Sequence, residues 1–197
     1  MGITDKTRRA LVIVDVQFDF VEGGSLAVEG GREVARRIAT ELILKYNPYD
    51  LIVTTQDWHI DPGDHFSEEP DFVKSWPRHC VAETAGAEIL PAIEAQLSLI
   101  DTPREIILKG QYEDAYSGFM GRTAEGHSLA QVLGEADIDE VDLVGIALDF
   151  CVAASAFDSA REGFRTRVLK DYTVGIIPEK MEELLDGGFA DAGVSVA

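Results

Sequence analysis

The sequence predicts a single-domain α/β protein built on an open, mostly parallel β-sheet with helices on both faces. Short apolar runs rich in β-branched residues alternate with segments of helical periodicity, which is typical of βαβ units. The runs are apolar throughout, as expected of strands that helices cover on both sides. No repeat, low-complexity tract or Pro/Ser-rich linker divides the 197 residues, so we expect one domain over 1–197.

The apolar runs are the expected strands of this sheet. Each is short and carries Val, Ile or Leu at most positions, which suits a pleated surface buried on both faces. The last of them, at the end of the chain, is expected to be an edge strand. In order along the chain, the runs are 10–14, 50–55, 105–109, 141–146, 165–169 and 194–197.

Helices are expected between these runs. Residues 32–46 place Val34, Ile38 and Leu42 on one face at helical spacing. Small residues, mostly alanine, fill the segment that follows Cys151. The expected helices are 32–46, 87–97 with a break near Pro91, 128–133, 151–162 and 179–185.

Composition and charge exclude several classes of partner. The chain carries 17 Lys+Arg and 36 Asp+Glu, a formal net charge of −19, which opposes binding to nucleic acid or to anionic membranes. The apolar run 10–14 is too short for a secretory signal or a spanning helix, so we expect a cytoplasmic protein. Cys80 and Cys151 are then expected to be free thiols, because the cytosol is reducing.

Polar residues stand at the carboxyl ends of four of the expected strands. Ligands of open α/β sheets bind beyond the carboxyl ends of the strands. A buried polar group is costly unless it is paired, so we expect these four residues to pair around one site. They are Asp15, Asp57, Lys109 and Cys151.

Three of these residues have two possible interpretations each. Cys151 opens the expected helix 151–162, where the helix N-terminus favours a thiolate and its N–H groups can hold an oxyanion. It is a candidate nucleophile, but a structural cysteine packed at a strand–helix joint fits the same position. Asp15 is either the base for this thiol or a helix-capping carboxylate. Lys109 is either a counter-charge in the site or a surface lysine.

The segment of about 57–80 carries a candidate metal site. Three of the four histidines of the chain lie there, after Asp57; they are His59, His65 and His79. One carboxylate and three imidazoles suit one divalent ion, Zn, Fe or Mn, with waters completing its shell. Prolines make the segment irregular, and a long irregular loop in a compact domain is usually functional. The alternative is a polar loop with solvated histidines. Cys80 is expected to be structural, because adjacent residues seldom ligate one ion.

These residues resemble the isochorismatase-like cysteine hydrolases, and among them the nicotinamidase (pyrazinamidase) branch. The Asp/Lys/Cys set marks the superfamily, and the Asp-Trp-His…His…His set marks the metal-containing nicotinamidases. The resemblance covers nearly the whole chain and implies the isochorismatase-like fold. The segments that carry it are 10–28, 55–66, 76–80, Lys109 with 115–119, and 145–152.

The resemblance implies roles for specific residues. The implied catalytic triad is Asp15, Lys109 and Cys151. The implied metal ligands are Asp57, His59, His65 and His79. The implied aromatic pocket is Phe20, Trp76 and Tyr116. The implied oxyanion hole consists of the backbone N–H groups of Ala147 and Cys151, next to a cis peptide at Ile146–Ala147.

The implied activity is hydrolysis of nicotinamide to nicotinate and ammonia through a cysteine thioester, in NAD salvage, with pyrazinamide as a second substrate. A homo-oligomer is compatible with the sequence. Phe18, Leu148 and Phe150 depart from the Asn, Thr and His of many relatives, which puts pocket polarity and substrate range in question. The alternatives are another small-amide or carbamoyl hydrolase of the superfamily, a metallohydrolase with a structural Cys151, or a non-catalytic isochorismatase-like binding domain.

Overall fold

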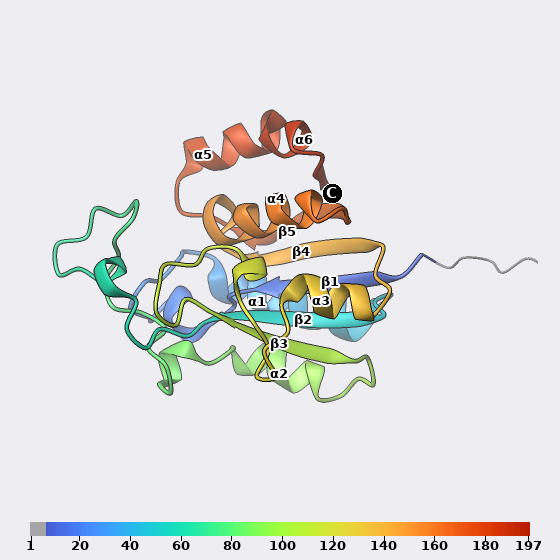
Figure 1. The fold of residues 1–197 in the computed structure, drawn as a ribbon, viewed down its shortest axis with the longest axis horizontal. Helices are drawn as coiled ribbons and strands as arrows, with labels where there is room; N and C mark the ends of the chain where they lie inside the picture. The colour runs from blue at the N-terminus through green and yellow to red at the C-terminus, as the bar shows by residue number, and fades with distance from the viewer. Residues whose placement is uncertain (1–6) are drawn as a thin grey trace, which may run out of the picture.

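The computed structural model describes residues 7–197, in which six parallel strands form one sheet between two layers of helices (Figure 1). The strand order is β3-β2-β1-β4-β5-β6. The predicted parallel α/β fold is therefore confirmed. The strands are β1 (Arg9–Val14), β2 (Leu51–Asp57), β3 (Arg104–Lys109), β4 (Glu140–Ile146), β5 (Arg165–Val174) and β6 (Ser195–Val196).

Six α-helices connect these strands; π-helical segments extend several of them, and the 3₁₀ turns stand apart from them in the loops. The α-helices are α1 (Gly31–Arg37), α2 (Pro91–Leu97), α3 (Leu129–Glu135), α4 (Ala153–Arg161), α5 (Pro178–Glu183) and α6 (Phe189–Asp191). The π-helical segments are η2 (Ile38–Lys45), η6 (Leu148–Val152) and η7 (Leu184–Gly188). The 3₁₀ turns are η1 (Phe18–Phe20), η3 (Gly63–His65), η4 (Ala85–Ala87) and η5 (Gly118–Met120).

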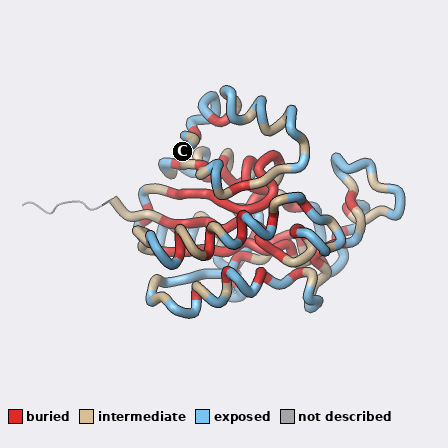
Figure 2. The backbone as a smooth tube through the Cα atoms, turned by 180° about the vertical axis from the view of Figure 1, so that it is seen from behind, coloured by how far each residue is buried: buried red, intermediate tan, exposed pale blue. Residues whose placement is uncertain are grey.

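The central strand β1 is buried on both faces, which explains why its sequence is apolar throughout. Leu11 and Ile13 pack in a core with α1, η2 and α2, whereas Val12 and Val14 pack in a second core with α3, α4 and α6. Successive side chains of a strand point to opposite faces, so a strand between two helical layers has no polar face. Figure 2 shows the buried residues, in red, along the strands in the middle of the molecule.

Two helix starts lie three or more residues from the positions expected from the sequence. The helix expected over 87–97 begins only at Pro91, because the residue before a proline avoids helical backbone angles, and Leu90 is extended (φ −59°, ψ 136°). The helix expected to open at Cys151 begins three residues earlier, at Leu148, with the π-helical turn η6. Cys151 therefore lies within the first turn instead of at its first position.

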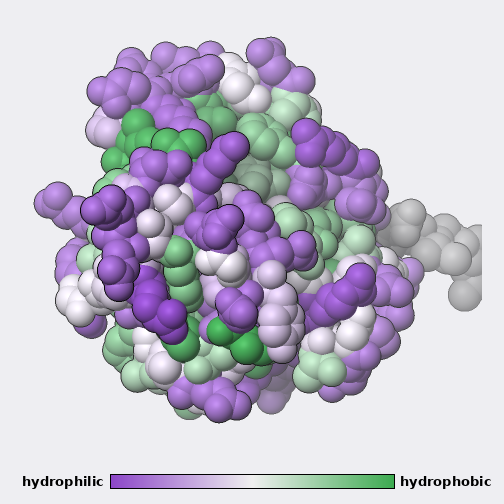
Figure 3. Space-filling view, turned by 60° about the vertical axis from the view of Figure 1, so that its left-hand side comes forward, coloured by the Kyte–Doolittle hydropathy of each residue, from purple (hydrophilic) through white to green (hydrophobic). Residues whose placement is uncertain are grey.

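The chain order reverses at the centre of the sheet. Strands β1, β2 and β3 proceed toward one edge, and β4, which pairs with β1, starts the progression toward the other edge. Such a switch point leaves a crevice beyond the strand ends, and ligands of open α/β sheets bind there. The irregular loops at this end of the sheet lie at the left of Figure 1, and the surface seen from that side is largely hydrophilic with small apolar patches (Figure 3). None of the helices in residues 7–197 is both long and apolar enough to cross a membrane.

Candidate active site

Asp15, Lys109 and Cys151 meet at the switch point between β1 and β4. The Lys109 Nζ atom lies 2.9 Å from Asp15 Oδ2 and 3.8 Å from Cys151 Sγ. Asp15 and Lys109 are fully buried, and Cys151 is 8% exposed at the bottom of a pocket. The structure thus brings together the three residues that the resemblance implies as a triad, and Lys109 is not a surface lysine.

The strand ends position this cluster. Asp15 follows β1 directly, in a left-handed backbone conformation (φ 49°), and its Oδ1 accepts a 2.6 Å hydrogen bond from Thr55 Oγ1 on β2. Lys109 is the last residue of β3 and is in register with Asp57 at the end of β2. Its Nζ donates to Asp57 Oδ1 at 2.5 Å and to the Ala115 carbonyl at 2.9 Å. One buried ammonium therefore serves two buried carboxylates.

The two carboxylates differ in proton affinity. Burial raises the pKa of Asp15, and the charge of Asp57 adds to this, against the opposing effect of Lys109. Burial acts on the pKa of Asp57 in the same direction, but the charge and hydrogen bond of Lys109, together with the neighbouring imidazoles, outweigh it and lower that pKa. Asp15 is consequently the carboxylate that can accept a proton, while Asp57 stays ionised. The same two carboxylates raise the pKa of Lys109 well above its usual range although burial opposes this, so Lys109 stays charged.

The thiol of Cys151 is protonated in the free protein. Burial raises its pKa well above the ordinary value, and Asp15 and Asp57 add to the effect, so that the opposing charge of Lys109 does not prevail. This differs from the expectation that the helix N-terminus favours a thiolate. A buried thiol beside two carboxylates needs a base to release its proton, and Asp15 is the neighbouring base.

His59, His65 and His79 form a compact, buried cluster. One ring nitrogen of each lies within 4.8 Å of one from each other ring. The Nδ1 atoms of His59 and His79 contact the carbonyl oxygens of Gly110 (2.5 Å) and Pro77 (2.7 Å), an arrangement that orients Nε2 of a metal-binding histidine.

The donor atoms of this cluster fit a metal ion. Nε2 of His59 and Nδ1 of His65 are buried without a hydrogen-bond partner, which is costly unless a ligand binds them. Asp57 Oδ2 lies 3.8 Å from Nε2 of His59 and 4.0 Å from Nε2 of His79. One carboxylate and three imidazoles suit a first-row divalent ion. Asp57 thus lies between this cluster and Lys109.

Burial keeps His79 and His65 neutral, the form that can ligate a metal. It lowers the pKa of His79 to about 4 and lowers that of His65 as well. Both shifts are opposed by the charge of Asp57, which is too weak to reverse them.

The metal-free protein is expected to lose stability as the pH falls from about 6.5 to about 4. The unfolded chain protonates His79 at its ordinary pKa of 6.5, whereas the folded chain does so only near 4, so acid favours unfolding within this window and has no further effect through His79 below it. The loss through this group is up to about 3 kcal/mol. Urea unfolding of chelator-treated protein at several pH values measures it. His79→Gln is the control and should show a shallower dependence; an equal slope in both proteins would contradict the assignment.

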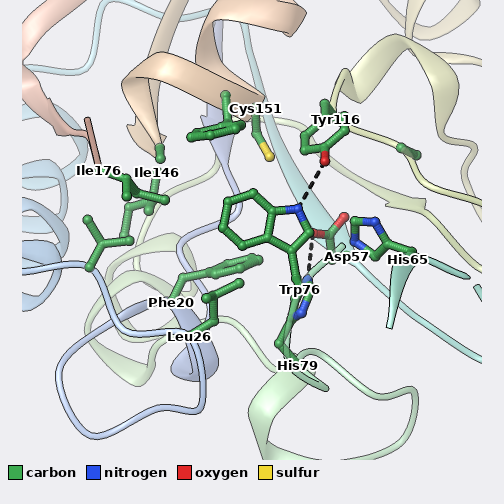
Figure 4. Close-up of a pocket in the computed structure, with 14 residues that line it drawn as sticks. Phe20, Leu26, Asp57, His65, Trp76, His79, Tyr116, Ile146, Cys151 and Ile176 are labelled. Carbon is green, nitrogen blue, oxygen red and sulfur yellow. Dashed lines mark hydrogen bonds and ion pairs between the residues drawn. The ribbon is translucent and has the colours of Figure 1, made fainter. Parts of the chain in front are cut away.

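A pocket beside Cys151 holds the three aromatic residues expected to line it. Phe20 and Trp76 are almost fully buried, and Trp76 Nε1 donates to Tyr116 Oη at 3.0 Å (Figure 4). The ring of Trp76 lies between Phe20 and Cys151 in this view. The same pocket is lined by Asp57, His65 and His79, so it joins the thiol to the histidine cluster.

The turn that leads from β4 to Cys151 forms another wall of the pocket. The peptide bond between Ile146 and Ala147 is cis, as the resemblance implies, and both residues line the pocket. Of the three departures from the family pattern, only Phe150 lines it; its ring contacts Trp76 edge-on at 5.2 Å between centroids. Phe18 and Leu148 pack in the two cores instead.

Three site residues escaped the sequence analysis. Thr55 hydrogen-bonds Asp15, and Gln17 hydrogen-bonds the backbone of Asp57. The buried carboxylate of Asp149 accepts hydrogen bonds from the N–H groups of residues 176 and 177, and the first of these two residues lines the pocket. Gln17 and Asp149 each stand two positions from a candidate catalytic residue among apolar neighbours, and that spacing is the signal that could have found them.

A family model described as the isochorismatase domain matches residues 9–190. The chain belongs to the isochorismatase family. This isochorismatase-family protein is 49% identical, over 168 residues, to the nicotinamidase/pyrazinamidase of Mycobacterium tuberculosis, with 85% of this chain and 87% of the relative covered.

Two solved structures have a similar fold. The pyrazinamidase of Pyrococcus horikoshii in complex with zinc is 34% identical with a TM-score of 0.79, and the match covers 96% of this chain and 98% of that one. The yeast nicotinamidase bound to the inhibitor nicotinaldehyde is 28% identical with a TM-score of 0.81, covering 96% and 99%. The isochorismatase-like fold expected from the sequence is confirmed.

Proposed function

We propose that this isochorismatase-family protein is a nicotinamidase, which hydrolyses nicotinamide to nicotinate and ammonia. One observation carries the proposal: a buried cysteine beside a carboxylate–lysine pair lines the same aromatic pocket as two members of a cluster of three histidines, whose ring nitrogens lie close together. The name of the relative at 49% identity supports it, as does the inhibitor bound by the yeast neighbour. Pyrazinamide, which also has a carboxamide on a nitrogen-containing ring, is the second substrate.

The proposed reaction begins at the thiol. Asp15 takes the proton from Cys151 Sγ, and the thiolate attacks the carboxamide carbon to form a C–S bond. The backbone N–H groups of Ala147 and Cys151 hold the resulting oxyanion. The proton on Asp15 passes to the departing nitrogen, ammonia leaves, and a thioester remains. Asp15 then takes a proton from water, which cleaves the thioester to nicotinate and restores the thiol.

Lys109 and the pocket residues support these steps. The ammonium of Lys109 offsets the negative charge that Asp15 and Cys151 carry between them. Phe20, Trp76 and Tyr116 line the pocket and hold the ring by its faces and edges beside Cys151.

Four residues would hold the metal ion. They are Asp57, His59, His65 and His79, the N₃O set described above. A bound divalent ion, Zn, Fe or Mn, supplies a Lewis acid to which a pyridine nitrogen can bind, which orients the ring. We further propose a cytoplasmic enzyme of NAD salvage that acts on a small molecule; its charge of −19 disfavours nucleic acid and membrane partners, and a homo-oligomer is compatible with it.

Ammonia release from nicotinamide, with metal analysis of the same sample, tests the proposal. Turnover by protein holding about one divalent ion per chain is expected, and small carbamoyl amides should be turned over far more slowly. Metal-replete protein that leaves nicotinamide and pyrazinamide intact would overturn the assignment. Preferred turnover of a carbamoyl amide would favour the other small-amide hydrolases of the family.

Replacement of a histidine of the cluster is expected to impair metal binding without changing the reactivity of the Cys151 thiol. His59→Ala or His79→Ala should lose bound metal and weaken nicotinamide binding, because each removes one of three imidazole donors. The thiol of Cys151 should still react with alkylating agents in both variants, since neither histidine contacts it in the described structure. Metal analysis and the rate of alkylation measure the two effects. Stoichiometric metal in both variants would show that the cluster is not the metal site.

A further inference from the structure

We propose that Gln17 is a positioning residue of this site, which holds Asp57 where the catalytic cluster and the histidine cluster meet. The inference concerns a residue that the mechanism above does not use. It rests on the proposed function for its effect on turnover, but its effect on metal binding is independent of the substrate.

Asp57 lies beyond the last residues at which β1 and β2 pair. Strand β1 pairs with β2 only as far as Val14 and Thr55, because the left-handed conformation of Asp15 turns the chain out of the sheet. Strand β2 continues for two more residues, to Asp57. The backbone of Asp57 therefore has no partner residue on β1. Because the end of β2 is buried, peptide groups of Asp57 without a hydrogen-bond partner would be costly there.

The side-chain amide of Gln17 supplies the missing partners. Its Oε1 accepts from the N–H of Asp57 at 2.9 Å, and its Nε2 donates to the carbonyl of Asp57 at 2.8 Å. A neighbouring parallel strand pairs with a residue through the same donor and acceptor, so the amide takes the place of the missing strand. Both bonds are formed by a residue with no exposed surface.

A third bond fixes the orientation of the amide. Nε2 also donates to the carbonyl of Ala87, at 2.8 Å, in the turn η4. Both N–H groups of the amide and its oxygen then have partners, and a buried amide that is fully paired resists rotation. Gln17 therefore holds Asp57 against a rigid support formed by η4.

Asp57 is the residue whose position matters to both clusters. Its Oδ1 accepts from Lys109, and its Oδ2 lies about 4 Å from His59 and His79, at the distances given above. A shift of its backbone would move both oxygens together. Loss of an outer-shell partner of a metal site typically lowers metal affinity or activity 10–100-fold. Displacement of a catalytic group by about 1 Å lowers the reaction rate by a similar factor.

Gln17→Met tests the proposal, with Gln56→Met as a matched control. Gln56 is the same residue type, is also buried, and donates to the same Ala87 carbonyl at 2.9 Å, but it makes no side-chain bond to Asp57. Zinc affinity is measured on metal-free protein by competition with a chromophoric chelator. We expect Gln17→Met to weaken zinc binding at least ~10-fold and Gln56→Met to change it less than ~3-fold. Equal losses in both variants, or none in Gln17→Met, would overturn the inference.

Turnover gives the second readout. At saturating zinc, Gln17→Met should lower kcat for nicotinamide and not only raise KM, because Asp57 also contacts Lys109. Gln17→Glu is the second variant: it keeps the length of the side chain and the acceptor for the Asp57 N–H, and its protonated form keeps one of the two donors. It should show an intermediate zinc affinity; a native affinity would count against the proposal. If native protein binds zinc but ignores nicotinamide, the proposed function fails while the zinc comparison still decides the role of Gln17.

Discussion

Replacement of Cys151 by alanine is expected to abolish nicotinamide hydrolysis, and Asp15→Asn is expected to lower kcat at least ~100-fold. The alanine variant lacks the nucleophile. The asparagine variant keeps the shape of the side chain but cannot take the proton of a thiol whose pKa burial raises well above its usual value. Ammonia release at saturating nicotinamide measures both effects.

Cys80→Ala is the matched control for the alanine variant. Cys80 is fully buried, its thiol contacts the Gly86 carbonyl at 3.8 Å, and burial raises its pKa too. We expect this variant to keep its turnover, and we expect iodoacetamide to modify Cys151 much faster than Cys80 in native protein, because only Cys151 lines the pocket. A metallohydrolase would instead tolerate Cys151→Ala. Near-normal turnover of Asp15→Asn beside an inactive Cys151→Ala would reduce Asp15 to a structural carboxylate.

Lys109→Met is expected to remove activity and to destabilise the fold by about 3–5 kcal/mol, the usual cost of breaking a buried ion pair from one side. Lys109 is 1% exposed and is the ammonium between Asp15 and Asp57, so its loss leaves two buried carboxylates facing each other. Asp15 would then hold a proton more tightly, because the positive charge that opposes the rise in its pKa is gone. A base that is already protonated cannot activate Cys151.

Urea unfolding and nicotinamide turnover measure these two effects of Lys109→Met. Lys180→Met is the control. Lys180 lies over the ring of Phe150, a pocket residue, with Nζ 3.8 Å from the ring centroid. It is not part of the buried cluster of Lys109 with Asp15 and Asp57. Its loss should cost about 1 kcal/mol or less. A Lys109→Met protein with native stability and turnover would show that the buried ammonium is not needed.

Local patterns in the sequence were sufficient to predict the fold. The alternation of apolar runs with helical periodicity predicted a parallel sheet, and strands β1 to β4 lie within two residues of the expected ranges at either end. The polar residues at the ends of those strands also converge as expected, since parallel strands end at the same edge of a sheet. The histidine cluster was predictable because its three members lie in one segment of the chain.

Only the tertiary structure decided how these groups act on one another. The pairing of Gln17 with Asp57 spans 40 residues and depends on where β1 leaves the sheet, which no local pattern encodes. The raised pKa of the Cys151 thiol was not expected, because the sequence indicates a helix terminus, which favours the thiolate, but not the burial that outweighs it. The sequence by itself determined which chemical groups are present and at which strand ends they stand, since periodicity and residue type are local properties. Proton affinities and positioning contacts were decided by the fold, because desolvation and Coulomb energy depend on distances between residues far apart in the chain.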